Sequence, residues 1–296
     1  MVRNVKFDTV KFAQQLGISD TVAKLMVNRG IYNLDIAKGF LDSSIDNLYN
    51  EYLSSSIGEL HNPTDMLGMS GAVELMRNSI IKGEKILIVG DYDVDGVIST
   101  YVLYIAISKC GGNVSFHIPD RIKEGYGINE SIIKKASEDN IDIIITCDNG
   151  IAAIEQVKLA KELGIKVIIT DHHDVPFIEE DNVRKYVVPE ADYVLNPKQE
   201  NCNYEFDKIC GAGVAYKFVQ CLYKEFNIPN EELYDLIQYV AIATVCDVVD
   251  LVSENRILVK EGLKRINNTS NIGLRALFKE TGLEGKEITV YSLGFV

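Results

Sequence analysis

Three short apolar runs stand out in the hydrophobic pattern of this chain, and polar residues follow each of them. The runs are KILIVG from Lys85, IDIIITC from Ile141 and KVIIT from Lys166. Short continuous β-branched runs are typical of strands that are buried on both faces of a parallel sheet. They alternate with helical patterns such as DGVISTYVLYIAISK and AAIEQVKLAKELG. This alternation predicts an α/β fold, with a mostly parallel sheet flanked by helices.

The pattern divides the chain into three segments. Residues 1–80 show helical periodicity without a strand pattern, so we expect an N-terminal helical arm. Residues 81–270 carry the strand and helix alternation, including the shorter strand candidates NVSFHIP and YVLN. The sequence ends in the apolar run TVYSLGFV. We therefore expect residues 271–296 to begin a connection to a C-terminal domain that lies outside this sequence.

Composition narrows the class of protein. A chain of 296 residues with 47% hydrophobic content fits one large domain with an appendage, or two domains. No apolar run reaches the roughly 18 residues that a membrane span needs. The start of the chain lacks the apolar core of a signal peptide, so we expect a cytoplasmic protein without a membrane partner.

The net charge of −13 argues against an extended nucleic-acid groove within this sequence. It does not exclude a phosphate-containing substrate, because a carboxylate cluster is acidic until it binds divalent ions. Such ions turn the cluster into a phosphate site. The charge therefore leaves the substrate open and places any basic groove elsewhere.

Asp93 and Asp95 follow the first apolar run, within GDYDVDG. Their spacing lets two carboxylates diverge toward two metal ions, and Gly96 permits the turn into the next helix. The alternative is that either aspartate caps that helix. Three aspartates within five residues favour metal binding.

Asp148 follows the second run, and Asp171, His172 and His173 follow the third. The carboxyl ends of parallel strands meet at one edge of the sheet, so we expect these side chains to converge there. Two adjacent histidines at a strand end favour a metal ligand beside an acid that faces the substrate. Asp171 could orient an imidazole without binding the metal itself.

Asp247 ends the most apolar predicted helix, which contains AIATVC. A carboxylate is unfavourable at a helix C-terminus, so a nearby cation explains it better than capping does. A cluster of buried carboxylates needs cations to offset its charge. Carboxylates with one or two imidazoles suit Mn²⁺ or Mg²⁺, and two such ions about 4 Å apart can polarise a phosphoryl group. The sequence thus predicts a two-metal hydrolytic centre.

Seven sequence blocks resemble the DHH phosphoesterase superfamily, and most closely its branch of RecJ single-strand-specific exonucleases. In order, they are GDYDVDG, IPDRIKEGYGIN, CDNGI, TDHH, LNPK, CGAGVAYKF and ATVCDVVDL. The leading blocks NRGIYN, FLD and MLGMSGAVELM extend the resemblance over nearly the whole chain. It implies that residues 81–270 form a Rossmann-like DHH catalytic domain preceded by a helical arm.

The resemblance also implies roles for individual residues. The metal ligands would be Asp93, Asp95, Asp148, His172 and Asp247, with Asp148 as the bridge and Asp91 in an accessory acidic position. The catalytic residues would be His173, Asp148 and Asp171. The substrate-binding residues would be Arg121, His173, Gly211 and Gly213. A solvated arginine and tight helix packing explain Arg121 and the two glycines about equally well.

The activity that this resemblance implies is 5′–3′ exonuclease digestion of single-stranded DNA in DNA repair and recombination. The cofactors would be two divalent ions, Mn²⁺ or Mg²⁺. The partners would be single-stranded DNA, and also a helicase and a single-strand-binding protein. Two departures stand out: Asp250 occupies a position where these exonucleases usually carry proline, and the domains that would hold the strand are not in the sequence. We therefore expect weak or altered exonuclease activity.

Other functions of the same superfamily remain open. A DHH hydrolase of short oligonucleotides, cyclic dinucleotides or pyrophosphate is one alternative. Pyrophosphatases of the superfamily carry a histidine four residues before the first ligand aspartate, where this chain has Val89. A catalytically impaired DHH scaffold protein is another alternative, but each ligand position here keeps a competent side chain.

Overall fold

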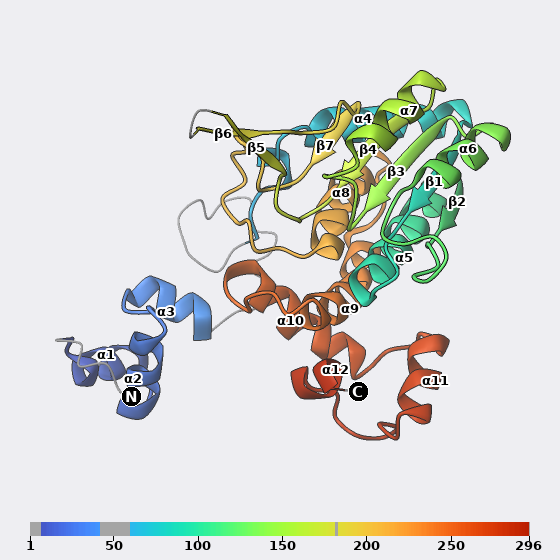
Figure 1. Cartoon of the computed structure of the whole chain (residues 1–296). Helices are drawn as coiled ribbons and strands as arrows, with labels where there is room; N and C mark the ends of the chain where they lie inside the picture. The colour runs from blue at the N-terminus through green and yellow to red at the C-terminus, as the bar shows by residue number, and fades with distance from the viewer. Residues whose placement is uncertain (1–6, 42–59, 181–182, 296) are drawn as a thin grey trace.

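The computed structural model describes residues 7–41, 60–180 and 183–295, and a five-stranded parallel sheet with helices around it forms the upper part of the molecule in Figure 1. Its strands are β1 (Lys85–Val89), β2 (Asn113–His117), β3 (Ile143–Cys147), β4 (Lys166–Thr170) and β7 (Tyr193–Leu195). They pair in the order β2-β1-β3-β4-β7, and every pair is parallel. The α/β fold that the hydrophobic pattern predicts is confirmed.

Helices cover both faces of this sheet. One face packs against α4 (Met69–Lys82), α5 (Val94–Lys109), α8 (Gly211–Glu225) and α9 (Asn230–Cys246), and the other against α6 (Glu130–Glu138) and α7 (Ile154–Glu162). Successive strand residues point to opposite faces. Ile86 and Ile88 of β1 therefore join the first core, while Leu87 and Val89 join the second. This double coverage explains why the strands read as continuous apolar runs.

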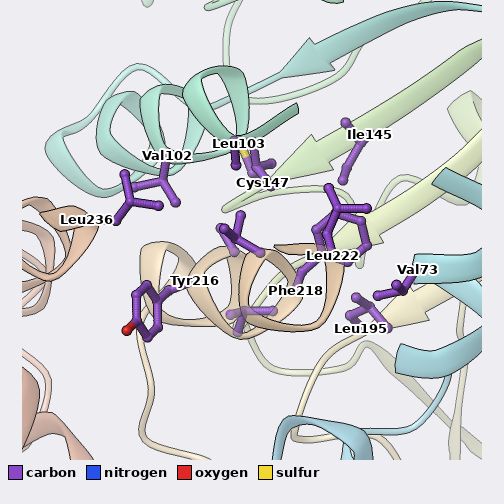
Figure 2. Close-up of a cluster of buried hydrophobic side chains, with 14 of the residues drawn as sticks. Val73, Val102, Leu103, Ile145, Cys147, Leu195, Tyr216, Phe218, Leu222 and Leu236 are labelled. Carbon is purple, nitrogen blue, oxygen red and sulfur yellow. The ribbon is translucent and has the colours of Figure 1, made fainter. Parts of the chain in front are cut away.

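The first of these cores is the larger, and Figure 2 shows its central side chains. Val102 of α5, Phe218 of α8, Ile145 of β3 and Leu195 of β7 gather there. Each such side chain stabilises the fold by about 1.5–3 kcal/mol when it is fully buried. Residues of α4 belong to the same core. Although α4 falls within the predicted arm 1–80, it packs with the sheet.

The rest of the predicted arm forms a separate small bundle. It consists of α1 (Thr9–Leu16), α2 (Asp20–Asn28) and α3 (Leu34–Leu41), which bury Phe12, Met26 and other residues against one another. Figure 1 shows this bundle beside α10 (Ser253–Ile266) and away from the sheet. The contact includes Arg256, whose Nε donates to the carbonyl oxygen of Phe40 at 2.8 Å. The remaining part of the arm, residues 42–59, lies outside the described residues.

The last helices pack on α9. The core between α9 and α10 contains Ala241, Val245 and Val259, and the helices α11 (Ile272–Glu280) and α12 (Val290–Phe295) follow. The expected role of residues 271–296 as a connection stays a prediction. Within the described residues we find no helix with the length and hydrophobicity of a transmembrane segment.

An exposed hairpin is an element that the sequence pattern does not predict. Its strands β5 (Phe177–Glu180) and β6 (Val183–Tyr186) pair antiparallel, and all their described residues are exposed. A strand without a buried face has no apolar alternation to reveal it.

The strand order creates a topological switch point at β1. The helix α5 connects β1 to β2, and α6 connects β2 to β3. The strands β2 and β3 therefore lie on opposite sides of β1. Open α/β sheets bind ligands in the crevice outside the carboxyl ends of their strands at such a point. The predicted site residues follow β1, β3 and β4 at this edge.

Candidate metal centre and active site

Four of the predicted metal ligands converge at the carboxyl edge of the sheet. Nε2 of His172 lies 3.1 Å from Oδ1 of Asp148, 3.7 Å from Oδ2 of Asp95 and 3.8 Å from Oδ2 of Asp247. These residues come from the first turn of α5, the loops after β3 and β4, and the end of α9. The fold thus brings together segments that are far apart in the sequence.

Three atoms of this group are buried without a hydrogen-bonding partner among the described residues. They are Oδ1 of Asp148, Nε2 of His172 and Oδ2 of Asp247. A buried polar atom without a partner costs about 1–3 kcal/mol, and more if it is charged. Since Nε2 of His172 lies within 4 Å of both oxygens, bound cations would satisfy these atoms. Oxygen ligands with one imidazole fit Mn²⁺ or Mg²⁺.

A second group of acidic oxygens lies next to the first. Asp91, Asp93 and Asp148 each present an oxygen, and these oxygens lie within 4.8 Å of one another. Asp95, His172 and Asp247 present two oxygens and a ring nitrogen that are equally close together. Asp148 belongs to the first of these sets and contacts His172 of the other at 3.1 Å. This arrangement suits two ions with Asp148 between them. A third set of the same kind contains Asp148, His172 and His173.

The backbone at Asp148 is left-handed, with φ of +59°. Aspartate and asparagine tolerate this conformation better than most residues do. Gly211 packs directly against it: a Cβ at Gly211 would lie 2.7 Å from Cβ of Asp148. A Cβ at Gly213 would instead meet Cγ1 of Ile209 at 2.3 Å. Of the two predicted glycines, only Gly211 lies against the ligand layer, and the surroundings of Gly213 favour the packing alternative.

Asp95 also holds the start of α8. Its Oδ2 accepts a hydrogen bond from the amide of Gly211 at 2.6 Å, and its Oδ1 accepts one from Ala212 at 2.8 Å. The N-cap residue of α8, Cys210, provides no side-chain cap of its own. Each carboxylate oxygen has two lone pairs, so these bonds leave acceptor capacity for a cation.

Asp93 is the N-cap of α5, and its Oδ1 accepts a hydrogen bond from the amide of Gly96 at 2.9 Å. The capping role considered for the DVD triplet is therefore real for Asp93. Asp93 is exposed, unlike Asp91 and Asp148, which are buried. Capping uses only one of its oxygens, so the same residue can face an ion.

Asp171 orients His173, as the sequence suggests. Oδ1 of Asp171 lies 2.7 Å from Nδ1 of His173 and accepts from the amide of His172 at 2.7 Å. Oδ2 accepts from the amide of Ile151 at 2.9 Å. The side chain of His173 is 47% exposed, whereas that of His172 is 10% exposed. The two neighbouring imidazoles therefore differ: His172 points inward and His173 reaches the surface.

Burial and neighbouring charges shift the ionisation of this cluster. Burial, followed by the charge of Asp95, strongly raises the pKa of Asp148. Burial and the charge of Asp93 raise the pKa of Asp247 to about 6. Burial lowers the pKa of His172. The protein groups alone thus supply too little positive charge to keep these carboxylates ionised. A bound cation would supply that charge.

The pKa values of Asp171 and His173 shift in the opposite directions to those of the metal-binding groups. The hydrogen bond with Asp171 raises the pKa of His173. Burial alone would raise the pKa of Asp171, but the hydrogen bond with His173 and the charge of that imidazole lower it. Asp171 is therefore ionised and favours the protonated form of His173.

Arg121 lies outside the metal cluster, at the end of a row of rings. Its guanidinium lies over the ring of Tyr92 at 5.2 Å. Tyr92 meets Tyr126 edge to face at 6.4 Å, and Tyr126 meets His173 at 6.0 Å. The structure does not bring Arg121 into contact with the ligands, and its expected contact with phosphate stays a prediction.

Tyr126 is a site residue that the sequence analysis did not single out. Its hydroxyl donates to the carbonyl oxygen of Asp148 at 3.0 Å and lies 3.4 Å from Nδ1 of His173. The available signal was its place in the EGYG block, between Gly125 and Gly127, both of which have positive φ. Flanking glycines let this loop turn so that the tyrosine reaches the ligand layer.

Comparisons with known proteins agree with this geometry. The family model described as "DHH family, N-terminal domain" matches residues 85–244. The chain is 39% identical over 289 residues, 97% of its length, to the single-stranded-DNA-specific exonuclease RecJ of Bacillus subtilis strain 168. It spans 33% of the length of that relative.

Solved structures with this fold include two of RecJ proteins. A crystal structure of exonuclease RecJ bound to manganese is 30% identical, with a TM-score of 0.66 over 78% of this chain and 55% of that one. A crystal structure of RecJ from Thermus thermophilus in complex with Mn²⁺ is 24% identical, with a TM-score of 0.73 over 97% of this chain and 37% of that one. The predicted resemblance and the predicted fold are both confirmed.

Proposed function

Because this chain belongs to the DHH family, we propose that it is a metal-dependent phosphodiesterase that acts on single-stranded DNA. The observation that carries the proposal is the convergence of three buried, unpartnered ligand atoms, from Asp148, His172 and Asp247. They lie beside a histidine that a buried aspartate holds in place. The similarity to a single-stranded-DNA-specific exonuclease supports this choice of substrate.

In this proposal one ion would be held by Asp95, His172 and Asp247 and the other by Asp91, Asp93 and Asp148, whose Oδ1 lies 3.1 Å from Nε2 of His172. When bound, two Mn²⁺ or Mg²⁺ ions supply positive charge that offsets a phosphate and polarises its oxygens. The carboxylates fix the positions of these charges, because hydrogen bonds to Gly211, Ala212 and Gly96 immobilise Asp95 and Asp93.

His173 acts on the substrate in this proposal. Its Nδ1 faces Asp171, and its side chain is half-exposed beside Asp148, so the imidazole can face a phosphodiester at the surface of the protein. Hydrolysis releases an alcohol whose oxygen must gain a proton. A protonated imidazole, favoured by Asp171, can donate a hydrogen bond to phosphate and deliver that proton.

The finer features of the activity follow from the family resemblance. We propose digestion from the 5′ end, in DNA repair and recombination, with a helicase and a single-strand-binding protein as partners. A DNA substrate suggests a cytoplasmic location. The chain carries 30 basic against 43 acidic residues. It should therefore bind long single strands weakly, with a shallow dependence of affinity on salt.

Two observations weigh against the alternatives. Val89, where pyrophosphatases of the superfamily carry a ligand histidine, is fully buried in the core on the α6 and α7 face of the sheet. This chain therefore has no metal-binding side chain at that position. A scaffold protein without catalysis would not need to keep buried acidic groups that destabilise the metal-free fold.

The test distinguishes the roles of His172 and His173. His172→Ala should weaken Mn²⁺ binding, measured by calorimetry, because it removes an atom that faces three carboxylates. His173→Ala should keep Mn²⁺ binding but slow the release of nucleotides from an end-labelled single strand by about 100-fold or more. The exposed Lys158 of α7 offers a control, and Lys158→Ala should alter neither quantity.

Absence of Mn²⁺ binding by the unmodified chain would contradict the two-metal centre. An equal loss of Mn²⁺ in the His172→Ala and His173→Ala variants would contradict the division of roles between the histidines.

A further inference from the structure

A pocket of about 360 Å³ lies beside the metal cluster, on the side of His173. Its walls are the loop of residues 126–128, the segment 149–153 after β3, Gln156 on α7, and residues Asp171, His173 and Asp174 after β4. Its volume is in the lower part of the range of about 300–1,000 Å³ that is usual for small-molecule sites. It has room for one compact organic group.

The pocket is continuous with the catalytic groups. His173 and Asp171 line it, and so does Tyr126, whose hydroxyl donates to the backbone of Asp148 at 3.0 Å. A group seated in the pocket therefore lies next to the imidazole that is proposed to face the scissile phosphate. The pocket is therefore placed to bind a part of the substrate that adjoins this phosphate.

The lining excludes another phosphate as that occupant. The residues that form the pocket include no lysine or arginine, but they do include the acidic residues Asp171 and Asp174. The nearby Lys198 is already paired with Asp174 at 2.9 Å. A second phosphate would therefore lie beside two carboxylates whose basic partners, His173 and Lys198, are already engaged.

The same lining suits a neutral planar ring. Ile128, Ile151, Ala152 and the half-exposed ring of Tyr126 supply apolar surface. Gln156 supplies both an amide donor and a carbonyl acceptor, and within the described part of the chain its side chain makes no hydrogen bond. Aromatic stacking tolerates every base, and an amide can turn either its donor or its acceptor toward a base edge.

We infer that this pocket binds the nucleobase of a nucleotide that adjoins the scissile phosphate. The inference rests on the proposed phosphodiesterase function and adds a subsite to it. Tyr126 stacks on the base, and its hydrogen bond to the backbone of Asp148 fixes the ring in advance. Ala152 and Ala153 keep the space open, and Gln156 contacts the polar edge without selecting one base.

The first test measures binding of thymidine 5′-monophosphate and of 2-deoxyribose 5-phosphate by calorimetry in the presence of Mn²⁺. The two ligands share the phosphate and the sugar and differ in the base. The nucleotide should bind at least about fivefold more tightly, since stacking of a base contributes about 1–3 kcal/mol. Ala152→Trp should remove this difference by filling the pocket, while Glu162→Gln, on α7 and outside the pocket, should keep it.

The second test measures hydrolysis of single-stranded oligonucleotides that carry an abasic site on one or the other side of the first scissile phosphate. One of the two sites should slow the unmodified chain about fivefold or more. Ala152→Trp should cut the intact oligonucleotide no faster than the slower abasic one. Glu162, on α7 and outside the pocket, is the control position, and Glu162→Gln should behave as the unmodified chain does.

Equal affinity of the unmodified chain for the two phosphates would overturn the inference, as would equal rates on all three oligonucleotides. A base preference that survives Ala152→Trp would also overturn it. Failure of the proposed function would look different: no oligonucleotide would be cut with Mn²⁺ present, whatever the two phosphates show in the binding experiment.

Discussion

At the scale of single residues, Asp148 meets two demands at once. Its backbone has φ of +59°, and its buried Oδ1 faces His172 without a hydrogen-bonding partner in the described part of the chain. The first demand favours aspartate, asparagine or glycine. The second requires a carboxylate. Substitutions can separate them, because asparagine meets the first demand and not the second.

Asp148→Asn and Asp148→Ala should both lose most of the stabilisation that Mn²⁺ provides. In the absence of metal the alanine variant should be less stable than the asparagine variant by about 1–2 kcal/mol, because alanine tolerates the left-handed backbone poorly. Denaturant unfolding with and without Mn²⁺ measures both effects. Asn140, with φ of 55°, is the matched control. Asn140→Ala should lower stability but keep the gain from Mn²⁺, and loss of that gain would argue against a specific role of Asp148.

The raised pKa of Asp247 predicts how the folding stability depends on pH. Its pKa rises from 3.8 to about 6 on folding, mainly through burial. Between these values the folded chain binds more protons than the unfolded chain, so folding stability falls as pH rises. The melting temperature of the metal-free protein should carry a component that decreases from pH 4 to pH 6. Asp247→Asn should remove that component, and an unchanged profile in this variant would assign the effect to other groups.

Mn²⁺ should oppose this trend, because carboxylates must lose their protons to bind metal. The stabilisation by a fixed concentration of Mn²⁺ should therefore grow as pH rises through about 6. Melting curves with a chelator and with Mn²⁺, recorded over the same pH range, separate the two effects.

Sequence reasoning identifies the ligands but not how they are held. The positions of Asp93, Asp95, Asp148 and His172 follow from strand ends, which the apolar runs reveal. The amides that hold Asp95 belong to Gly211 and Ala212. This contact joins residues more than a hundred positions apart, so it depends on tertiary packing that no local pattern encodes. The contacts of Tyr126 with Asp148 and His173 likewise depend on tertiary packing.

At the scale of elements, the junction between α5 and α8 is the most constrained. Asp95, in the first turn of α5, receives both hydrogen bonds from the start of α8. A helix N-terminus favours negative charge, so α8 helps to keep this carboxylate in place. Gly211 is needed because Asp148 leaves no room for a side chain there.

Gly211→Ala should displace Asp148 and remove most of the stabilisation by Mn²⁺, since the added Cβ would meet its Cβ at 2.7 Å and its Cα at 3.0 Å. Gly213→Ala is the matched control on the same helix. It would press on the side chain of Ile209, and overpacking of this kind typically costs about 1–3 kcal/mol. The control should keep the gain from Mn²⁺ in thermal unfolding. Equal losses of that gain in both variants would contradict the special position of Gly211.

The central strands β1, β3 and β4 were predictable because nearly all of their residues are buried on both faces of the sheet. The hairpin of β5 and β6 was not, because its described residues are exposed and lack a periodic signal. The sequence places α4 in the arm. Its association with the sheet depends on contacts of Met69 and Met76 with distant residues of the main core.

At the scale of the whole molecule, a buried ion pair joins three distant segments. Nζ of Lys217 on α8 lies 2.6 Å from Oε2 of Glu254 on α10, and both side chains are fully buried. Lys217 also donates to the carbonyl oxygen of His61, and the hydroxyl of Tyr204 donates to Glu254. The network links the chain before α4 to α8 and α10. The helix α8 begins with the amides that bind Asp95, and α10 follows Asp247 in the sequence.

Glu254→Gln should lower the free energy of unfolding by about 3–5 kcal/mol, because it leaves Lys217 charged and buried without its partner. The double variant Lys217→Met with Glu254→Leu should recover much of this loss, because apolar residues can replace a buried pair. Denaturant unfolding measures both. The exposed pair of Lys208 and Asp250 is the control, and Lys208→Ala should have a far smaller effect. A double variant less stable than Glu254→Gln would contradict this account.

The metal centre draws its ligands from residues 91 to 247, through a sheet whose strands are all parallel. Such long-range contacts close late in folding, so the full ligand set exists only when most of the chain is in place. An ion that binds this set stabilises an arrangement that the folding transition state has not yet completed. It therefore slows unfolding more than it accelerates folding. We therefore expect the lifetime of the folded chain to lengthen as the concentration of divalent metal rises.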